Sequence, residues 1–393
     1  MKKRDKKLEN EMEGVSKILK AGLMVAVGFI LGAVFSGLIY GNGGRREDSP
    51  DSGKDEKIKV LEDRVSELES ENEALKAAPN GFYQKLSSGR DVNVLIVGDS
   101  IGAGSGATDG AGWPDLLAKS FREDCHVKCN MENISMGGCT SYAGYVRTQL
   151  LDDGMNYDLA IICYGENDSR DSLSEEYEAI IRLLRAKYDR CSIISVLESS
   201  QKDYTPKIGI IQELANHYSI PVADTIKAFE DSSIPYDDLT VDGKHPNDSG
   251  HRLYFETIRD IIETHAESYE PYDDADYSPY NAGMAEYESF YEIPSDSFVR
   301  DGDSAFEIPV NGKLRGIPGI RHEFYPEGGS LAVYVDGELF QRLSLDWPYE
   351  FSQDSIYKIS DEPMDASSSI RLEFSSKINA DGFKGLVFTG LGE

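Results

Sequence analysis

The stretch Val92–Gly102, VNVLIVGDSIG, decides the fold. Its first six residues form an apolar run typical of a short buried strand, and its last five form a turn with Ser100 between two glycines. Small flanking residues allow a sharp turn that exposes the hydroxyl at the carboxyl end of the strand, where α/β sheets build their sites. Alone, the string is weak evidence of catalysis, because glycine and serine also form ordinary turns.

Predicted strands and helices alternate from residue 90 onward. We expect strands at 92–97, 126–132, 158–164, 192–197 and 220–223, and helices at 113–122, 140–151, 173–188, 206–218 and 247–265. This alternation indicates an α/β domain, with a parallel sheet between two layers of helices. Because ligands bind at the carboxyl ends of such strands, residues that follow each strand are the candidates for a site.

Ser100 needs a base, a group that orients the base, and donors for an oxyanion. Of the six histidines, His245 is distinguished by Asp242, which lies three residues before it, close enough to hold the imidazole. The alternative for His245 is a structural hydrogen bond in a loop. His251 and His265 fall in the following helix and are expected at the surface.

Two segments between the serine and the histidine offer oxyanion donors. In residues 133–140, NISMGGCT, Gly138 allows a backbone N–H to approach the site closely. In residues 164–168, YGEND, Asn167 offers a side-chain amide just after a predicted strand. The ordinary alternative is that strands often end in such turns.

Together these segments resemble the SGNH hydrolases, also called GDSL-type esterases, over about residues 90–265. Ser100 matches the nucleophile of that family, Gly138 and Asn167 match its oxyanion residues, and Asp242 and His245 match its Asp-x-x-His block. The resemblance implies a three-layer, flavodoxin-like parallel sheet and a serine esterase that works through an acyl-enzyme. The oxyanion would be held by the Ser100 N–H, the Gly138 N–H and the Asn167 side chain.

Two further residues, Asp99 and Asn133, are expected to support this site. The chain departs from the usual family pattern at Ser135 and Ile101, and neither change touches the chemistry. The five-residue serine string also fits the α/β-hydrolase nucleophile elbow. That family is a poor fit, because its elbow is preceded by several strands, whereas here a predicted membrane segment and a charged stalk precede Ser100.

Composition sets broad limits on function. A chain of 393 residues allows two folded domains, and a net charge of −30 argues against binding of nucleic acid. No Cys/His cluster has zinc spacing, so we expect no metal, and we expect no cofactor. Of the five cysteines, Cys125 and Cys129 could pair.

The first 40 residues predict a membrane anchor. Residues 1–20 are a basic tail, and residues 21–40 are uncharged and long enough to span a bilayer. The positive-inside rule then places the amino terminus in the cytoplasm and the catalytic domain outside the membrane. The alternative is a cleaved signal peptide, whose apolar region is typically shorter.

The next segment predicts a parallel homodimer. After a flexible linker at 41–55, residues 56–77 carry an apolar heptad seam with Asn72 at an a position and three g–e pairs of opposite charge. Gly28, Gly32 and Ser36 add a small-residue face to the membrane helix. The alternative is a single solvated helix, since three heptads are marginal alone.

The carboxyl-terminal part has a different character. After the hydrolase domain at 90–267, residues 268–290 are read as a linker or a segment that wraps the surface, and residues 291–393 as an all-β domain, a sandwich, with a hairpin turn at Asp336-Gly337. Trp347, Tyr349 and Tyr357 could stack on sugars, or they could be core residues.

The function expected from the sequence is a membrane-anchored, extracytoplasmic serine esterase. Its partners would be an acylated carbohydrate, such as an O-acetylated polysaccharide, and a second copy of the chain. The alternatives are a lysophospholipase, thioesterase or acyltransferase on the same fold, or a non-catalytic surface module that binds glycan.

Overall fold

The computed structural model describes residue 64 and residues 81–152, 154–268 and 277–390. Residues 78–393 form one compact unit. The predicted basic tail, membrane anchor, linker and coiled coil lie outside the described residues, Arg64 apart. Among the helices that the structure describes, none is both long enough and apolar enough to cross a bilayer.

The first domain is built on a parallel sheet of five strands in the order β2-β1-β3-β4-β5. The strands are β1 Val92–Gly98, β2 Cys129–Asn133, β3 Leu159–Cys163, β4 Ser192–Leu197 and β5 Val222–Asp224. This is the flavodoxin-like order, so the predicted three-layer α/β fold is confirmed.

Strand β1 lies inside the sheet because both of its faces are apolar. Leu95 and Val97 point into one core, while Val94 and Ile96 point into the other. Successive side chains of a strand alternate between faces, so an unbroken apolar run is what a strand covered on both sides requires.

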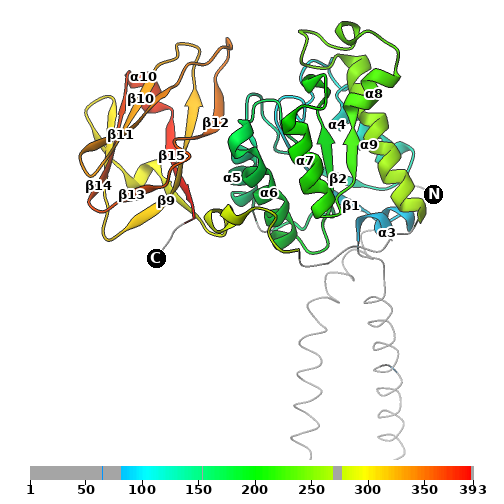
Figure 1. The fold of residues 1–393 in the computed structure, drawn as a ribbon, viewed down its shortest axis with the longest axis horizontal. Helices are drawn as coiled ribbons and strands as arrows, with labels where there is room; N and C mark the ends of the chain where they lie inside the picture. Colours follow the sequence, from blue (N-terminus) through cyan, green and yellow to red (C-terminus); the bar gives the residue numbers. More distant parts are fainter. Residues whose placement is uncertain (1–63, 65–80, 153, 269–276, 391–393) are drawn as a thin grey trace, which may run out of the picture. The chain divides into compact units, whose positions relative to one another are not determined.

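Helices cover both faces of this sheet, as Figure 1 shows. One face packs against α5 Ser141–Gln149, α6 Arg170–Lys187 and α7 Pro206–His217, and the other against α3 Phe82–Ser87, α4 Trp113–Glu123 and α9 Asp248–Ser268. Helix α8, Thr225–Asp231, was not predicted. Its amino terminus is capped by Asp224, whose side chain accepts a hydrogen bond from the Lys227 N–H.

Residues 280–287, part of the segment predicted as a linker or a surface wrap, lie against the first domain. The buried Glu178 carboxylate of α6 accepts hydrogen bonds from the backbone N–H groups of Tyr280 and Asn281. Tyr145 of α5 donates to the carbonyl of Tyr287 at 2.8 Å, so residues 280–287 are fixed to two helices.

The second domain is a β-sandwich, as predicted. One sheet has the order β11-β10-β14-β8-β7 and the other β12-β9-β15-β6, with β13 paired to β9. The hairpin between β10 and β11 turns at Asp336-Gly337, as expected. The elements are β6 Phe290–Pro294, β7 Val299–Asp301, β8 Ala305–Pro309, β9 Leu314–Phe324, β10 Ser330–Val335, β11 Glu338–Ser344, β12 Gln353–Lys358, β13 Met364–Ala366, β14 Ser369–Phe374, α10 Lys377–Asp381 and β15 Phe383–Thr389.

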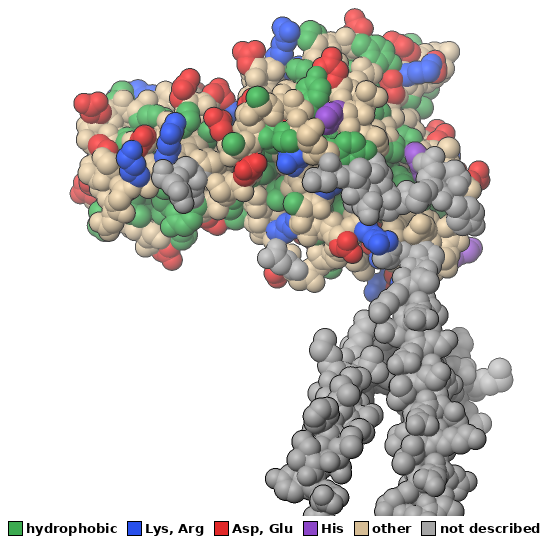
Figure 2. Space-filling model, turned by 60° about the horizontal axis from the view of Figure 1, so that its bottom comes forward, with side chains coloured by type: hydrophobic (Ala, Val, Ile, Leu, Met, Phe, Trp, Pro, Cys, Tyr) green, Lys and Arg blue, Asp and Glu red, His purple; other side chains and the backbone are tan. Residues whose placement is uncertain are grey.

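The two domains share apolar packing. Ile317, Ile356 and Val387 of the sandwich are buried in the same cluster as the residues of α5 and α6. On the face of the molecule in Figure 2, acidic and basic side chains are interspersed rather than gathered into a patch of one sign.

All five cysteines are free thiols, so Cys125 and Cys129 do not pair.

Candidate active site

The nucleophile turn follows β1 directly. Its geometry needs glycine: a Cβ at Gly98 would lie 2.7 Å from the carbonyl oxygen of Cys163, and one at Gly102 would lie 2.7 Å from the Ser135 hydroxyl. The Asp99 carboxylate tightens the turn by accepting from the Ile101 N–H at 2.8 Å. These contacts hold Ser100 at the carboxyl end of the strand, as the sequence predicted.

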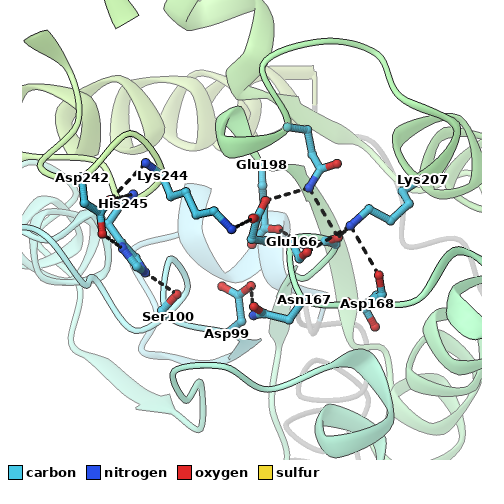
Figure 3. Close-up of polar contacts among 12 residues, drawn as sticks. Asp99, Ser100, Glu166, Asn167, Asp168, Glu198, Lys207, Asp242, Lys244 and His245 are labelled. Atoms are coloured by element: carbon cyan, nitrogen blue, oxygen red, sulfur yellow. Dashed lines mark hydrogen bonds and ion pairs between the residues drawn. The ribbon is translucent and has the colours of Figure 1, made fainter. Parts of the chain in front are cut away.

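Ser100, His245 and Asp242 come together as one hydrogen-bonded chain (Figure 3). His245 Nε2 lies 2.9 Å from Ser100 Oγ, and His245 Nδ1 lies 2.7 Å from Asp242 Oδ2. The other carboxylate oxygen of Asp242 accepts from the His245 N–H at 2.8 Å. This is the geometry in which imidazole removes a hydroxyl proton while a carboxylate holds the ring in the required tautomer.

The surroundings of Asp242 keep it ionised. Burial would raise the pKa of this carboxyl, but hydrogen bonds from the His245 ring, the His245 N–H and the Lys244 N–H outweigh burial and lower the pKa to about 2. A carboxylate that stays charged at neutral pH can stabilise the imidazolium that forms when His245 takes a proton.

The predicted oxyanion loop lies beside the nucleophile. A Cβ at Gly137 would lie 3.8 Å from the Ser100 Cβ, and Gly138 has a φ of +71°, a conformation that glycine adopts without strain. Within the described part of the chain, the backbone N–H groups of Ser100 and Gly138 have no hydrogen-bond acceptor. Both N–H groups are therefore available to donate a hydrogen bond.

The structure also places Asn167 and Asn133 at the site. The Asn167 amide nitrogen donates to Asp99 Oδ2 at 2.9 Å and to the carbonyl of Cys139 at 3.2 Å, so its two hydrogens already have acceptors. Asn133 donates to the carbonyl of Gly102 at 2.9 Å. It therefore connects the oxyanion loop to the nucleophile turn.

A buried pair of carboxyl groups, of which the sequence indicated only Asp99, lies under the site. Asp99 and Glu198 are both fully buried and hydrogen-bond to each other. Burial raises the pKa of Asp99 to about 7 and raises the pKa of Glu198 well above its ordinary value. The pair therefore holds a proton at neutral pH, and the available signal was the position of Glu198 directly after β4.

Two lysines connect the loops around the triad through an ion pair and hydrogen bonds. Lys244 forms an ion pair with Glu166 at 2.6 Å, which joins the histidine loop to the end of β3. Lys207 Nζ donates to the carbonyls of Gly165 and Glu166 at 2.5 and 3.0 Å. Figure 3 shows both lysines reaching toward the loop that carries Asn167.

The histidine loop is packed against the nucleophile turn. Gly106, at φ +98°, lies so close that a Cβ there would be 2.3 Å from the Pro246 carbonyl oxygen and 3.0 Å from the His245 Cβ. Behind this loop lies His251, whose predicted surface position is wrong. It is fully buried, and its Nε2 lies 3.0 Å from the Ser105 carbonyl oxygen.

The β-sandwich contributes to the edge of the site. Gln353 Nε2 donates to the carbonyl of Gly137 at 2.8 Å, and the Trp347 ring lies 3.9 Å from where a Cβ of Gly138 would be. Trp347 is 5% exposed, whereas Tyr349 and Phe351 are 39% and 57% exposed and stack on each other. We call residues 347–351 the aromatic loop, in which Trp347 is the buried residue.

Among the described residues, no group of three or more His, Cys, Asp or Glu side chains is arranged to hold a metal ion. A serine with a hydrogen-bonded imidazole and two free N–H donors is equipped for acyl transfer.

Comparison with known families agrees with this geometry. The model of the GDSL-like lipase/acylhydrolase family matches residues 96–253. These residues form a GDSL-like acylhydrolase domain. The enzyme class is carboxylic ester hydrolase, and the GDSL-like domain contains all the residues that the sequence assigned to the site.

Solved structures similar to this chain extend the comparison to the sandwich. A two-domain esterase active on acetylated mannans, crystallised with mannopentaose, has a TM-score of 0.64 and 16% identity over 79% of this chain and 93% of its own. A second structure of a two-domain esterase described in the same words has a TM-score of 0.62 and 16% identity over 78% and 94%. An acetyl xylan esterase is 20% identical over 44% of this chain and 100% of its own, with a TM-score of 0.38. No curated protein sequence matches the chain.

Because the first two matches extend well beyond the GDSL-like domain, the pairing of hydrolase and β-sandwich also occurs in another esterase. At 16% identity this likeness shows the fold of both domains.

Proposed function

We propose that this chain is a membrane-anchored, extracytoplasmic serine esterase that removes short acyl groups, acetyl in particular, from a polysaccharide. The observation that carries the proposal is the hydrogen-bonded chain from Ser100 through His245 to Asp242, set beside the aromatic loop of the second domain. The GDSL-like family supports the acylhydrolase part.

Each residue has a defined part in the reaction. Ser100 Oγ attacks the ester carbonyl carbon while His245 Nε2 takes its proton, and the negative charge on the former carbonyl oxygen is held by the N–H groups of Ser100 and Gly138. His245 then gives the proton to the departing sugar hydroxyl, leaving an acyl-enzyme. Water, deprotonated by His245, releases the acid and regenerates Ser100.

The Asn167 amide is the third donor of this proposal. Its longer hydrogen bond, 3.2 Å to the Cys139 carbonyl, would be exchanged for one to the oxyanion, while the 2.9 Å bond to Asp99 keeps the amide in place. Catalytic hydrogen bonds of this kind commonly reach their final geometry only with substrate bound.

The aromatic loop supports a carbohydrate substrate. Tyr349 and Phe351 present a stacked, exposed aromatic surface. A sugar with one apolar face fits a surface of this kind, since aromatic rings bury much area in a fixed geometry. The similar two-domain esterase is active on acetylated mannans, which supports the same class of substrate here.

The membrane anchor at 21–40 and the parallel coiled coil at 56–77 complete the proposal. They rest on the length of the uncharged segment, the basic residues before it and the heptad pattern after it. Tethered to the membrane, two copies would have a high effective concentration for pairing.

The test is hydrolysis by residues 78–393, which form one compact unit, and by the same chain with Ser100→Ala. Substrates are p-nitrophenyl esters of two to twelve carbons and an acetylated mannan. We expect hydrolysis that depends on Ser100, falls with acyl length and releases acetate from the mannan. Activity retained by Ser100→Ala would overturn the triad, and a folded parent inactive on every ester would favour a module that only binds glycan.

A further inference from the structure

We propose that Gln353 of the β-sandwich is a positioning residue for the oxyanion hole. Its side-chain amide donates to the Gly137 carbonyl at 2.8 Å and thereby fixes the peptide group that carries the Gly138 N–H. The inference rests on the proposed serine chemistry and adds a residue from the second domain.

The planarity of the peptide bond links the two atoms. The Gly137 carbonyl and the Gly138 N–H belong to the same peptide group, and in a trans peptide they point in opposite directions. Since the carbonyl points at Gln353, the N–H points away from it. That N–H has no acceptor among the described residues, and Gly137 packs within van der Waals reach of Ser100.

This peptide group needs to be held because glycine flanks it on both sides. Gly137 and Gly138 lack the side chains that restrict backbone rotation, and Gly138 already has a φ of +71°. A rotated peptide would direct the carbonyl oxygen, instead of the N–H, toward the developing negative charge. One hydrogen bond of ordinary net strength biases such an equilibrium by about tenfold.

The bond also improves the donor itself. A carbonyl that accepts a hydrogen bond polarises its own peptide group, which makes the N–H on the other side a stronger donor. Gln353 would therefore act both on the orientation and on the strength of the Gly138 N–H.

Gln353 is well placed to resist movement. It begins β12, where it pairs with Phe324 of β9. The next two residues of β12 also contact the first domain. The Asp354 carbonyl accepts from Arg147 at 3.1 Å, and the Ser355 hydroxyl lies 3.2 Å from the Cys139 thiol. Strand β12 therefore runs alongside the oxyanion loop and presents Gln353 from a fixed backbone.

The experiment compares three variants of the full-length chain in detergent. Gln353→Met keeps the approximate shape and removes the donor, Gln353→Lys keeps a donor, and Gln341→Met makes the same chemical change on β11, away from the site. The measurements are kcat and KM for p-nitrophenyl acetate, the rate at which a fluorophosphonate labels Ser100, and the melting temperature.

We expect Gln353→Met to lower kcat and the labelling rate by about tenfold, within the 10²- to 10³-fold limit for losing an oxyanion donor altogether. KM should stay within about twofold, because the Gly138 N–H holds a charge that develops only in the transition state. Gln353→Lys should recover most of the rate, and Gln341→Met should match the parent.

Other outcomes overturn the inference or its basis. Unchanged kcat and labelling in Gln353→Met would refute the positioning role. The role would also be refuted if Gln353→Met and Gln353→Lys lost kcat and labelling rate equally and both had a lowered melting temperature. A general packing role for Gln353 would then explain the losses. A parent that labels at Ser100 but hydrolyses no ester would refute the proposed substrate alone, with the labelling rates still deciding on Gln353. A parent that does neither would overturn both.

Discussion

The ion pair between Lys358 of β12 and Glu176 of α6 should be important for stability, and its size can be judged from burial. The Glu176 side chain is 2% exposed and that of Lys358 is 16% exposed. Removing one partner of a buried pair leaves an uncompensated charge and costs about 3–5 kcal/mol. Since Glu176 keeps the hydrogen bond from the Tyr142 N–H, we take the lower end, about 3 kcal/mol, for Lys358→Met.

For a unit of this size, about 3 kcal/mol corresponds to a melting temperature lowered by about 4–5 °C. Thermal unfolding followed by circular dichroism would measure it. The matched control is Lys227→Met, because the Lys227–Asp231 pair is 62% and 65% exposed and should change the melting temperature by less than about 2 °C.

A double variant tests the reason for the loss. Lys358→Met combined with Glu176→Gln leaves no buried charge at either position, and the amide oxygen can still accept from the Tyr142 N–H, so most of the stability should return. A Lys358→Met variant as stable as the Lys227→Met control would refute the reasoning, as would a double variant no better than the single one.

Three further outcomes are expected. Asp242→Asn should lower kcat by about 10³- to 10⁴-fold with little change in melting temperature, and a loss below tenfold in steady-state assays would contradict its role as orienter. Burial raises the pKa of Asp99 from 3.8 to about 7 and raises the pKa of Glu198 well above its ordinary value, so the folded chain holds protons that the unfolded chain releases. Stability therefore falls as pH rises from about 4 to about 7. Glu198→Gln removes one of these acids, and its melting temperature should drop less than that of the parent between about pH 5 and about pH 8; an equal drop would exclude Glu198 as a cause. Tyr349→Ala, at a position 39% exposed, should raise KM for acetylated mannan about tenfold and leave p-nitrophenyl acetate unaffected, and equal effects on both substrates would argue against a sugar contact.

The parts of the site that were predictable from sequence are those set by local geometry. Ser100 and Asn167 follow apolar strands whose carboxyl ends must meet at one edge of a parallel sheet. Asp242 and His245 are three residues apart, so a single loop can join them. None of these assignments needed knowledge of how distant segments pack.

The residues that were missed depend on packing between distant segments. Gln353 reaches Gly137 across 216 positions of sequence, and the relation arises only when the sandwich docks on α5 and α6. Glu198 follows β4 directly, which was the available signal, but hydropathy patterns do not show that its carboxyl group is buried. His251 was expected at the surface because it falls in the helix after the histidine loop, but it faces the inside of the domain, where the Trp113 N–H points at its ring.

The predictions about the first 77 residues remain predictions. The anchor and the coiled coil were inferred from the length of an uncharged run and from heptad spacing, and the described residues contain only Arg64 from this region. They call for a separate measurement, such as membrane fractionation and cross-linking of the full-length chain.

The close packing of Gly106 against the histidine loop affects how mutational data on this enzyme should be read. Any side chain at this position would collide with Pro246 and the His245 Cβ, and would move the imidazole away from Ser100. In a saturation mutagenesis screen, Gly106 would therefore score as intolerant as the triad itself. Sensitivity to substitution would rank it among the reacting groups, although glycine has no side chain that could take part in the reaction.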